Sequence, residues 1–141
     1  MHGRTLRLAK PGMRLDLGAI GKGYVGDDMP RGFQAHGCGR AMAVMSGDID
    51  CGDGMWHVKL EASGETLPLR RCAASTSGDT VQHIFDARTG AYVEGVSLVS
   101  VVARMGMLAE ALATAVRIVG EAEGQKLATR HHATAWFRRV S

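Results

Sequence analysis

The sequence predicts an α+β fold in which an antiparallel or mixed sheet, built from hairpins, packs against a few helices. Most apolar stretches are short and are separated by turn residues, which is typical of strands joined in hairpins. A few longer stretches have apolar residues at helical spacing instead. The composition, 45% hydrophobic and 22% charged, is enough for a folded core. We therefore expect one domain over residues 1–141.

The first two elements follow from local pattern. Residues 4–18 alternate well enough to form one or two strands around a Pro-Gly turn. Residues 18–37 predict an amphipathic helix, because apolar side chains recur there at four-residue spacing. These side chains are Val25, Met29 and Phe33. Pro30 should kink this helix or end it early, since an interior proline costs about 3 kcal/mol.

The middle of the chain reads as strands and turns. Residues 40–49 predict a short strand that runs into a glycine turn. Residues 55–62 and 65–75 are expected to pair as a hairpin. The following stretch, STSGD at 75–79, consists of small polar residues and is expected to be a loop.

The last third contains another expected hairpin, formed by residues 81–85 and 95–103 around the turn DARTG. Residues 107–120 form the clearest predicted helix. Its apolar stripe consists of Leu108, Leu112, Ala115 and Val119. Residues 121–130 predict a second helix, and residues 133–140 a closing strand.

Charge and composition exclude several classes of function. The net charge of +3 is small and the basic residues are scattered, while aromatic residues make up only 5%. A nucleic-acid partner is therefore not expected, and a small phosphate-bearing ligand explains the basic residues better. Three separated cysteines and six histidines lack zinc-ligand spacing. The chain as given has no signal peptide and no apolar run of about 18 residues, so as written it is expected to be soluble and cytoplasmic, while the compartment of the protein stays unknown from the sequence.

The stretch DLGAIGKGY at 16–24 places three glycines and Lys22 at a strand-to-helix junction. Glycine lets backbone N–H groups approach a phosphate closely, and a helix N-terminus favours negative charge. The spacing matches neither standard nucleotide fingerprint. On composition alone, a plain glycine turn with a solvated lysine is the safer interpretation. SGDIDCGDG at 46–54 fails as a calcium loop, which leaves a polar turn between strands.

Three further features could carry chemistry. Glu110 and Thr114 are four residues apart and share a helix face, a spacing of oxygen ligands that suits Mg²⁺. The alternative is a surface glutamate beside a threonine that bonds its own helix. The hydroxyls of STSGD could cover a ligand or form an ordinary loop. In VQHIFDARTG, turn chemistry explains Asp86 and the glycine, but it does not explain His83 or Arg88.

Each of these signals is weak alone, but their order along the chain is informative. Between Leu15 and Val116 the chain carries, in this order, LDLGAIGKGY, SGDI, STSGD, HIFDARTG and AEALATAV, and the resemblance that they carry extends over Leu15–Val140. This series resembles the C-terminal half of the ApbE-like FAD:protein FMN transferases. The family pattern runs DLG-x-I-x-KGY, a GGD/E turn, a TSG loop, SHI[IV]DP-[RK]-TG and AD-x-L-AT-[AG].

The resemblance implies an ApbE-like fold and a defined reaction. Enzymes of this family bind FAD and, with Mg²⁺, transfer its FMN moiety to a Ser or Thr hydroxyl of an acceptor flavoprotein, releasing AMP. His83 matches the proposed base. The residues that match FAD contacts or lie beside the flavin are Asp16, Lys22, Ser77, Gly78 and Ile84. The residues that match metal ligands are Ala19, through its carbonyl oxygen, Glu110 and Thr114.

The chain also departs from the family pattern. Glu110 replaces the family's aspartate, and the other departures are Gln82 for serine, Ala87 for proline, Ser46 for glycine and the helix residue Pro30. These departures support one alternative function, a flavin-binding module without activity. A second alternative is an FAD pyrophosphatase, which would use the same metal with water as the nucleophile.

Family members are about twice as long as this chain. The resemblance implies that the N-terminal half, which supplies much of the adenine side of the FAD pocket, has no counterpart here. Exposed apolar surface could then require a second copy or a partner chain that supplies the missing half. Family members usually act on the outer side of the bacterial inner membrane.

Overall fold

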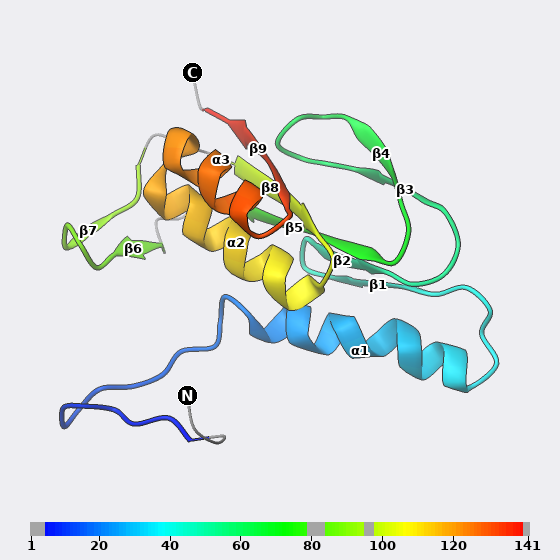
Figure 1. The fold of residues 1–141 in the computed structure, drawn as a ribbon, viewed down its shortest axis with the longest axis horizontal. Coiled ribbons are helices and arrows are strands. Elements are labelled where there is room, and N and C mark those ends of the chain that lie inside the picture. Colours follow the sequence, from blue (N-terminus) through cyan, green and yellow to red (C-terminus); the bar gives the residue numbers. More distant parts are fainter. Residues whose placement is uncertain (1–4, 79–83, 95–97, 140–141) are drawn as a thin grey trace.

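The computed structural model describes residues 5–78, 84–94 and 98–139 (Figure 1). In chain order its elements are α1 (Gly21–Ala35), β1 (Met42–Met45), β2 (Asp48–Cys51), β3 (Trp56–Lys59), β4 (Thr66–Leu69), β5 (Cys72–Gly78), β6 (Phe85–Asp86), β7 (Ala91–Tyr92), β8 (Leu98–Ala103), α2 (Gly106–Val119), α3 (Glu121–Arg130) and β9 (Thr134–Arg138).

A five-stranded sheet in the order β1-β2-β5-β8-β9 forms the centre of the fold, and every neighbouring pair is antiparallel. Two small hairpins, β3–β4 and β6–β7, lie outside this sheet. Helices α2 and α3 cover one face, and the β3–β4 hairpin covers the other (Figure 1). The predicted α+β class, with an antiparallel sheet built from hairpins and a few packed helices, is confirmed.

Apolar clusters form the core on both faces of the sheet: two main ones, and a small one of Ala73, Ala103 and Ala109 where α2 meets the sheet. The cluster between the sheet and α2 and α3 contains Val99, Val101, Leu112, Ala113, Val116, Ala128 and Ala135. The cluster beneath the β3–β4 hairpin contains Cys51, Val58, Leu60, Leu69 and Ala74. Because side chains of a strand point alternately to opposite faces, each central strand contributes to both layers.

Helix α1 forms where predicted, but it buries a different face. Its buried residues are Gly23, Gly26 and Pro30, whereas the predicted apolar stripe of Val25, Met29 and Phe33 is exposed. The glycines let the α1 backbone approach α2 and β2 so closely that larger side chains would not fit. The prediction that the stripe faces the core is wrong, because small size rather than hydrophobicity selects the packed face.

Pro30 does not end α1, which continues to Ala35. The proline ring lies on the buried face, where a Cβ built on Gly52 would meet Pro30 Cβ at 2.9 Å. The contact of this face with β1 and β2 offsets the backbone hydrogen bond that proline removes. The expectation of an early helix end is therefore wrong.

The described part of the first predicted strand pair, residues 5–18, contains no strand. Strand N–H and C=O groups need a neighbouring strand, and the sheet edges β1 and β9 pair only inward in the described residues. Leucines of this segment are exposed as a result: Leu6, Leu8, Leu15 and Leu17. A pattern of alternating apolar and polar residues leads to a strand only where a neighbouring strand is available for backbone hydrogen bonds.

Two further predictions are corrected. Ser75–Gly78 are not a loop, because β5 includes them and pairs with β2 and β8 on either side. The expected hairpin of residues 81–85 with 95–103 does not form in the described residues. Phe85–Asp86 pairs with Ala91–Tyr92, while β8 pairs with β5 and β9. Local spacing identified the turn but not the strand partners.

One more prediction is wrong: residues 46–54, expected to be a polar turn between strands, contain strand β2 (Asp48–Cys51), which pairs with β1 and β5. The element predictions that follow are confirmed. Helix α2 begins one residue before the predicted stretch 107–120, α3 coincides with residues 121–130, and β9 lies within residues 133–140. Residues 55–62 and 65–75 pair as the β3–β4 hairpin, although the second stretch is divided at Arg71, whose φ is +50°. None of the helices in the described residues is long and apolar enough to cross a membrane.

Candidate functional site

A pocket of about 500 Å³ lies between the start of α1, the β1–β2 turn, the end of β5, the β6 segment and one side of α2. Residues from all five predicted motifs line it. They are Asp16, Gly18, Ala19, Lys22, Ser46, Asp48, Ser75, Thr76, Ser77, Gly78, Ile84, Phe85, Glu110, Thr114 and Ile118. Segments that are nearly 100 residues apart in sequence therefore meet at one place.

The pocket contains a lysine between two buried carboxylates. Lys22 Nζ lies 2.6 Å from Asp48 Oδ2 and 3.5 Å from Glu110 Oε1. The carboxylate side chains are 3% and 4% exposed, whereas that of Lys22 is 44% exposed. Burial opposes the charge on Lys22, but the hydrogen bond and charge of Asp48, with a contribution from Glu110, raise its pKa above its ordinary value. The ammonium is therefore charged at neutral pH.

Asp48 is held by its cross-strand partner. Ser75 lies directly opposite Asp48 in the β2–β5 ladder, and its hydroxyl donates to Asp48 Oδ1. Both residues are buried on the face of the sheet that α2 covers. One oxygen of this carboxylate thus binds the strand opposite, and the other faces Lys22.

Glu110 is held by the backbone of α1. The N–H of Gly23 donates to Glu110 Oε2 over 2.8 Å, in a buried contact between the two helices. A Cβ on Gly23 would lie only 2.3 Å from the Gly106 backbone, so glycine permits this approach. The other oxygen, Oε1, accepts no hydrogen bond from the described residues. The expectation of a surface glutamate is wrong, because Glu110 is 3% exposed.

An aspartate from α1 caps α2. The carboxylate of Asp27 accepts hydrogen bonds from the N–H groups of Gly106 and Met107, at 2.6 and 3.1 Å. These N–H groups have no partner within their own helix, and the negative charge favours a helix N-terminus. The cap fixes α2, which carries Glu110 and Thr114, relative to α1, which carries Lys22.

The segment before α1 turns sharply at the pocket edge. Asp16 Oδ1 accepts a hydrogen bond from the N–H of Gly18 over 2.7 Å, a local turn that bends the chain into the helix. Asp16 is exposed, and Ala19 is partly buried. Both residues line the pocket, so its edge offers one carboxylate and backbone groups.

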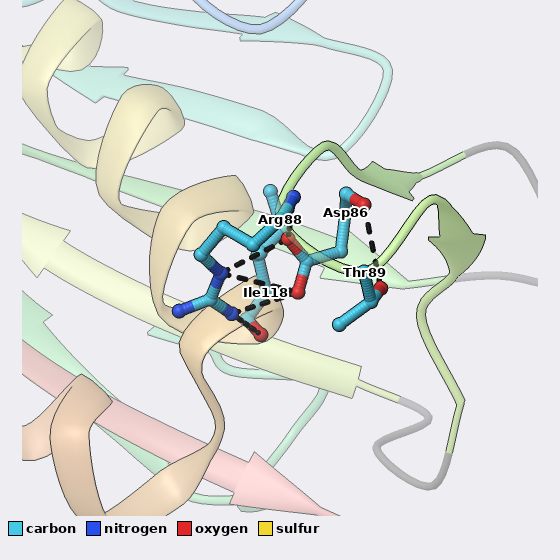
Figure 2. Close-up of polar contacts among 4 residues, drawn as sticks. All are labelled: Asp86, Arg88, Thr89 and Ile118. Carbon is cyan, nitrogen blue, oxygen red and sulfur yellow. Dashed lines mark hydrogen bonds and ion pairs between the residues drawn. The ribbon is translucent and has the colours of Figure 1, made fainter.

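The turn DARTG docks on the C-terminal end of α2 (Figure 2). Arg88 Nη2 donates to Asp86 Oδ2 over 2.8 Å and to the Ile118 carbonyl over 3.1 Å. The Arg88 guanidinium lowers the pKa of the Asp86 carboxyl. A cation at a helix C-terminus also interacts favourably with the helix dipole. This explains Arg88 as a structural residue that holds the segment carrying Ile84 against α2.

Eight of the nine residues predicted for the site line this pocket. The flavin-side group is Asp16, Lys22, Ser77, Gly78 and Ile84, and the metal-side group is Ala19, Glu110 and Thr114. His83, the proposed base, lies outside the described residues. Asp48 and Ser75 were not predicted. The motif SGDI pointed to Asp48, but nothing in the sequence places Ser75 opposite it.

The pocket has the negative charge and the oxygen atoms that suit a divalent cation. Two buried carboxylates face one ammonium, which leaves one negative charge uncompensated, and Glu110 Oε1 is no closer than 3.5 Å to the Lys22 ammonium. Thr114 follows one helical turn later and lines the same pocket. No group of three His, Cys, Asp or Glu side chains in the described ranges could hold a metal. Any ion here must therefore also use hydroxyl, carbonyl, phosphate or water oxygens, as Mg²⁺ commonly does.

Comparisons with known proteins agree on one family. The family model described as ApbE family matches residues 1–137. The FAD:protein FMN transferase of Rhodobacter capsulatus is 31% identical over 156 residues, a match that covers 96% of this chain and 30% of the relative. The FAD:protein FMN transferase of Treponema pallidum (strain Nichols) is 32% identical over 148 residues, covering 82% and 41%.

A solved structure has the same fold. The crystal structure of the Pseudomonas stutzeri flavinyl transferase ApbE in its apo form matches with a TM-score of 0.77 and 25% identity. The match covers 91% of this chain and 48% of that one. The chain thus spans less than half the length of each of these three relatives.

Proposed function

Because the chain belongs to the ApbE family, we propose that it transfers the FMN moiety of FAD to a Ser or Thr hydroxyl of an acceptor flavoprotein, in a reaction that requires Mg²⁺ and releases AMP. One observation carries the proposal: Lys22 and Glu110, from motifs far apart in sequence, meet in one pocket, with Glu110 Oε1 3.5 Å from the Lys22 ammonium. Phosphoryl-group transfer needs this combination of positive charge and metal-binding oxygens.

In the proposed reaction the acceptor hydroxyl oxygen attacks the FMN phosphorus of FAD. A new P–O bond forms to the acceptor, the P–O bond to the AMP phosphate breaks, and AMP leaves with the bridging oxygen. The hydroxyl proton passes to a base, for which His83 remains our candidate. The Lys22 ammonium faces the pocket and is suited to neutralise the charge of the pyrophosphate oxygens.

The other proposed roles follow the position of each residue in the pocket. The Ala19 carbonyl, the Glu110 carboxylate and the Thr114 hydroxyl would hold Mg²⁺, which would polarise the pyrophosphate and stabilise the leaving group. Asp16, Ser77 and Gly78 would contact FAD, and Ile84 would lie beside the flavin. Ile84 is 8% exposed and lines the pocket, so it offers an apolar wall to a planar ring.

The test is to titrate FAD into the full chain with and without Mg²⁺, and then to add an acceptor domain with a Ser/Thr flavinylation site. An increase in acceptor mass equal to FMN, together with AMP release, supports transfer. AMP and free FMN without acceptor labelling would instead indicate FAD pyrophosphatase activity. FAD binding without AMP release would indicate a flavin-binding module, and no FAD binding would refute the proposal for this chain.

Glu110 variants test the metal role. We expect Glu110→Gln to lose at least about tenfold in Mg²⁺-dependent activity, because it removes the charged ligand. Glu110→Asp should keep or raise activity, since it restores the residue of the family pattern. Glu65→Gln, at an exposed position near the β3–β4 hairpin, is the matched control and should have no effect. Equal activity of the chain and both Glu110 variants would rule out a metal role for this carboxylate.

A further inference from the structure

We propose that Asp48, held by Ser75, is a positioning residue that fixes the Lys22 ammonium for the phosphates of bound FAD. The inference rests on the proposed function, because it takes FAD as the ligand of the pocket. It assigns roles to two buried residues that the motif comparison did not single out. Neither residue needs to touch the flavin, since both act through Lys22.

The geometry of Asp48 suits an anchor. The residue is 2% exposed and lies on β2, in direct register with Ser75 on β5. Strand β5 pairs on its other side with β8, so both residues belong to the interior of the sheet. With Oδ1 bound by the Ser75 hydroxyl, Oδ2 is left to face Lys22 Nζ at 2.6 Å. The carboxylate therefore has one orientation, set by the strand ladder.

Lys22 needs such an anchor. Its side chain is 44% exposed and has four rotatable bonds, so holding it in one place costs conformational entropy. Without Asp48, the nearest negative group would be Glu110 Oε1, now 3.5 Å away. The Lys22 ammonium would then pair directly with Glu110 Oε1, the oxygen that we propose as a metal ligand. The Asp48 contact holds the Lys22 ammonium at 2.6 Å, closer than the 3.5 Å that separates it from the Glu110 oxygen.

A simpler interpretation is that Lys22 only neutralises a buried carboxylate, with no role in binding. The two interpretations differ in the sign of one effect. Removing the negative charge of Asp48 should by itself strengthen binding of an anion such as FAD. Loss of positioning should instead weaken it, because the lysine must then be ordered when FAD binds.

The experiment is a double-mutant cycle of Asp48→Asn and Lys22→Met, with the dissociation constant for FAD measured by flavin fluorescence and thermal unfolding followed in parallel. We expect Asp48→Asn to weaken FAD binding about fivefold, as the cost of ordering one long side chain predicts. In the Lys22→Met chain the same change should have no weakening effect, because there is no ammonium left to position. Asp28→Asn, which removes an exposed aspartate of α1, is the matched control for charge.

Ser75 provides a variant that leaves the charge unchanged. Ser75→Ala should weaken FAD binding about two- to threefold, the cost of one hydrogen bond that orients a carboxylate. Ser75→Thr keeps the hydroxyl and should restore the affinity. If Asp48→Asn fails to fold, the two Ser75 variants still test the inference.

Three results would overturn the inference. Asp48→Asn could bind FAD more tightly, or it could weaken FAD binding equally with Lys22 and with Met at position 22. The third result is that Ser75→Ala weakens FAD binding and Ser75→Thr does not restore it. FAD binding without acceptor modification would overturn the proposed function alone, because the cycle measures only binding. If the unsubstituted chain binds no FAD, both are overturned.

Discussion

The carboxyl of Asp50 gives the sharpest test of how this fold responds to pH. Asp50 is 4% exposed, and its side chain lies between two glycines at the junction of α1, α2 and β2. A Cβ built on Gly26 would be 1.9 Å from Asp50 Oδ2, and one on Gly106 would be 2.1 Å from Oδ1. Among the described residues, Oδ2 has no hydrogen-bond partner. The carboxyl fills the junction but has little to stabilise its charge.

Burial raises the pKa of Asp50 from 3.8 to about 7, with smaller contributions from the charges of Asp27, Asp48 and Glu110. Below pH 4 the carboxyl is protonated in both states. Between pH 4 and 7 the unfolded chain releases the proton and the folded chain keeps it, so the folded state loses stability as the pH rises. At about 1.4 kcal/mol per unit, the full loss above pH 7 approaches about 4 kcal/mol.

Asp50→Asn removes this titration and keeps the shape of the side chain. Its stability relative to the unsubstituted chain should therefore rise by up to about 4 kcal/mol between pH 4 and 8, whatever constant cost the buried amide adds. The assay is urea denaturation in metal-free buffer at intervals of one pH unit. Asp28→Asn, at an exposed position, should give a difference that hardly changes with pH. A flat difference for Asp50→Asn as well would refute the argument.

Three further predictions concern helix packing and the turn. Gly26→Ala should lower the free energy of unfolding by about 3 kcal/mol, because its Cβ would meet the buried carboxylate of Asp50. Gly32→Ala, on the open side of α1, should raise the free energy of unfolding by about 1 kcal/mol. Urea denaturation measures both changes. Asp27→Ala should cost about 1–2 kcal/mol by removing the α2 cap, and Asp27→Asn should cost less. Arg88→Met should speed amide hydrogen exchange over residues 84–92 while changing global stability by under about 1 kcal/mol, since Arg88 is largely exposed. Unchanged exchange there would show that the turn does not depend on Arg88.

The helices could be predicted from local sequence patterns, whereas the site residues could be predicted only from the order of motifs along the whole chain. Residues 107–120 and 121–130 carry their own helix signals, so α2 and α3 could be predicted locally. The meeting of Lys22 with Glu110 could not, because 88 positions separate them and only the order of motifs related them to one pocket. Periodicity failed where tertiary contacts decide, as for the exposed stripe of α1 and the strand pairing of residues 5–18.

Asp48 and Ser75 show a different limit of sequence reasoning. Their contact depends on the register of two strands, and a shift of one residue would place them on opposite faces of the sheet. Register follows from the whole sheet and not from either stretch alone. Nor could the sequence show that Glu110 is buried, because the glycine that admits it lies on another helix.

The glycine contact between α1 and α2 has a consequence for sequence drift. The helix face that carries Gly23 and Gly26 sets the distance between the lysine and the glutamate of the pocket, so almost any larger residue there would separate them. The opposite face of α1 is exposed, so larger side chains there would not change the distance between the helices. In a library of random variants, we expect α1 to tolerate substitution on one side and to reject even alanine on the other. Selection for activity would thus keep glycine at positions 23 and 26 as strictly as it keeps the lysine and the glutamate of the pocket.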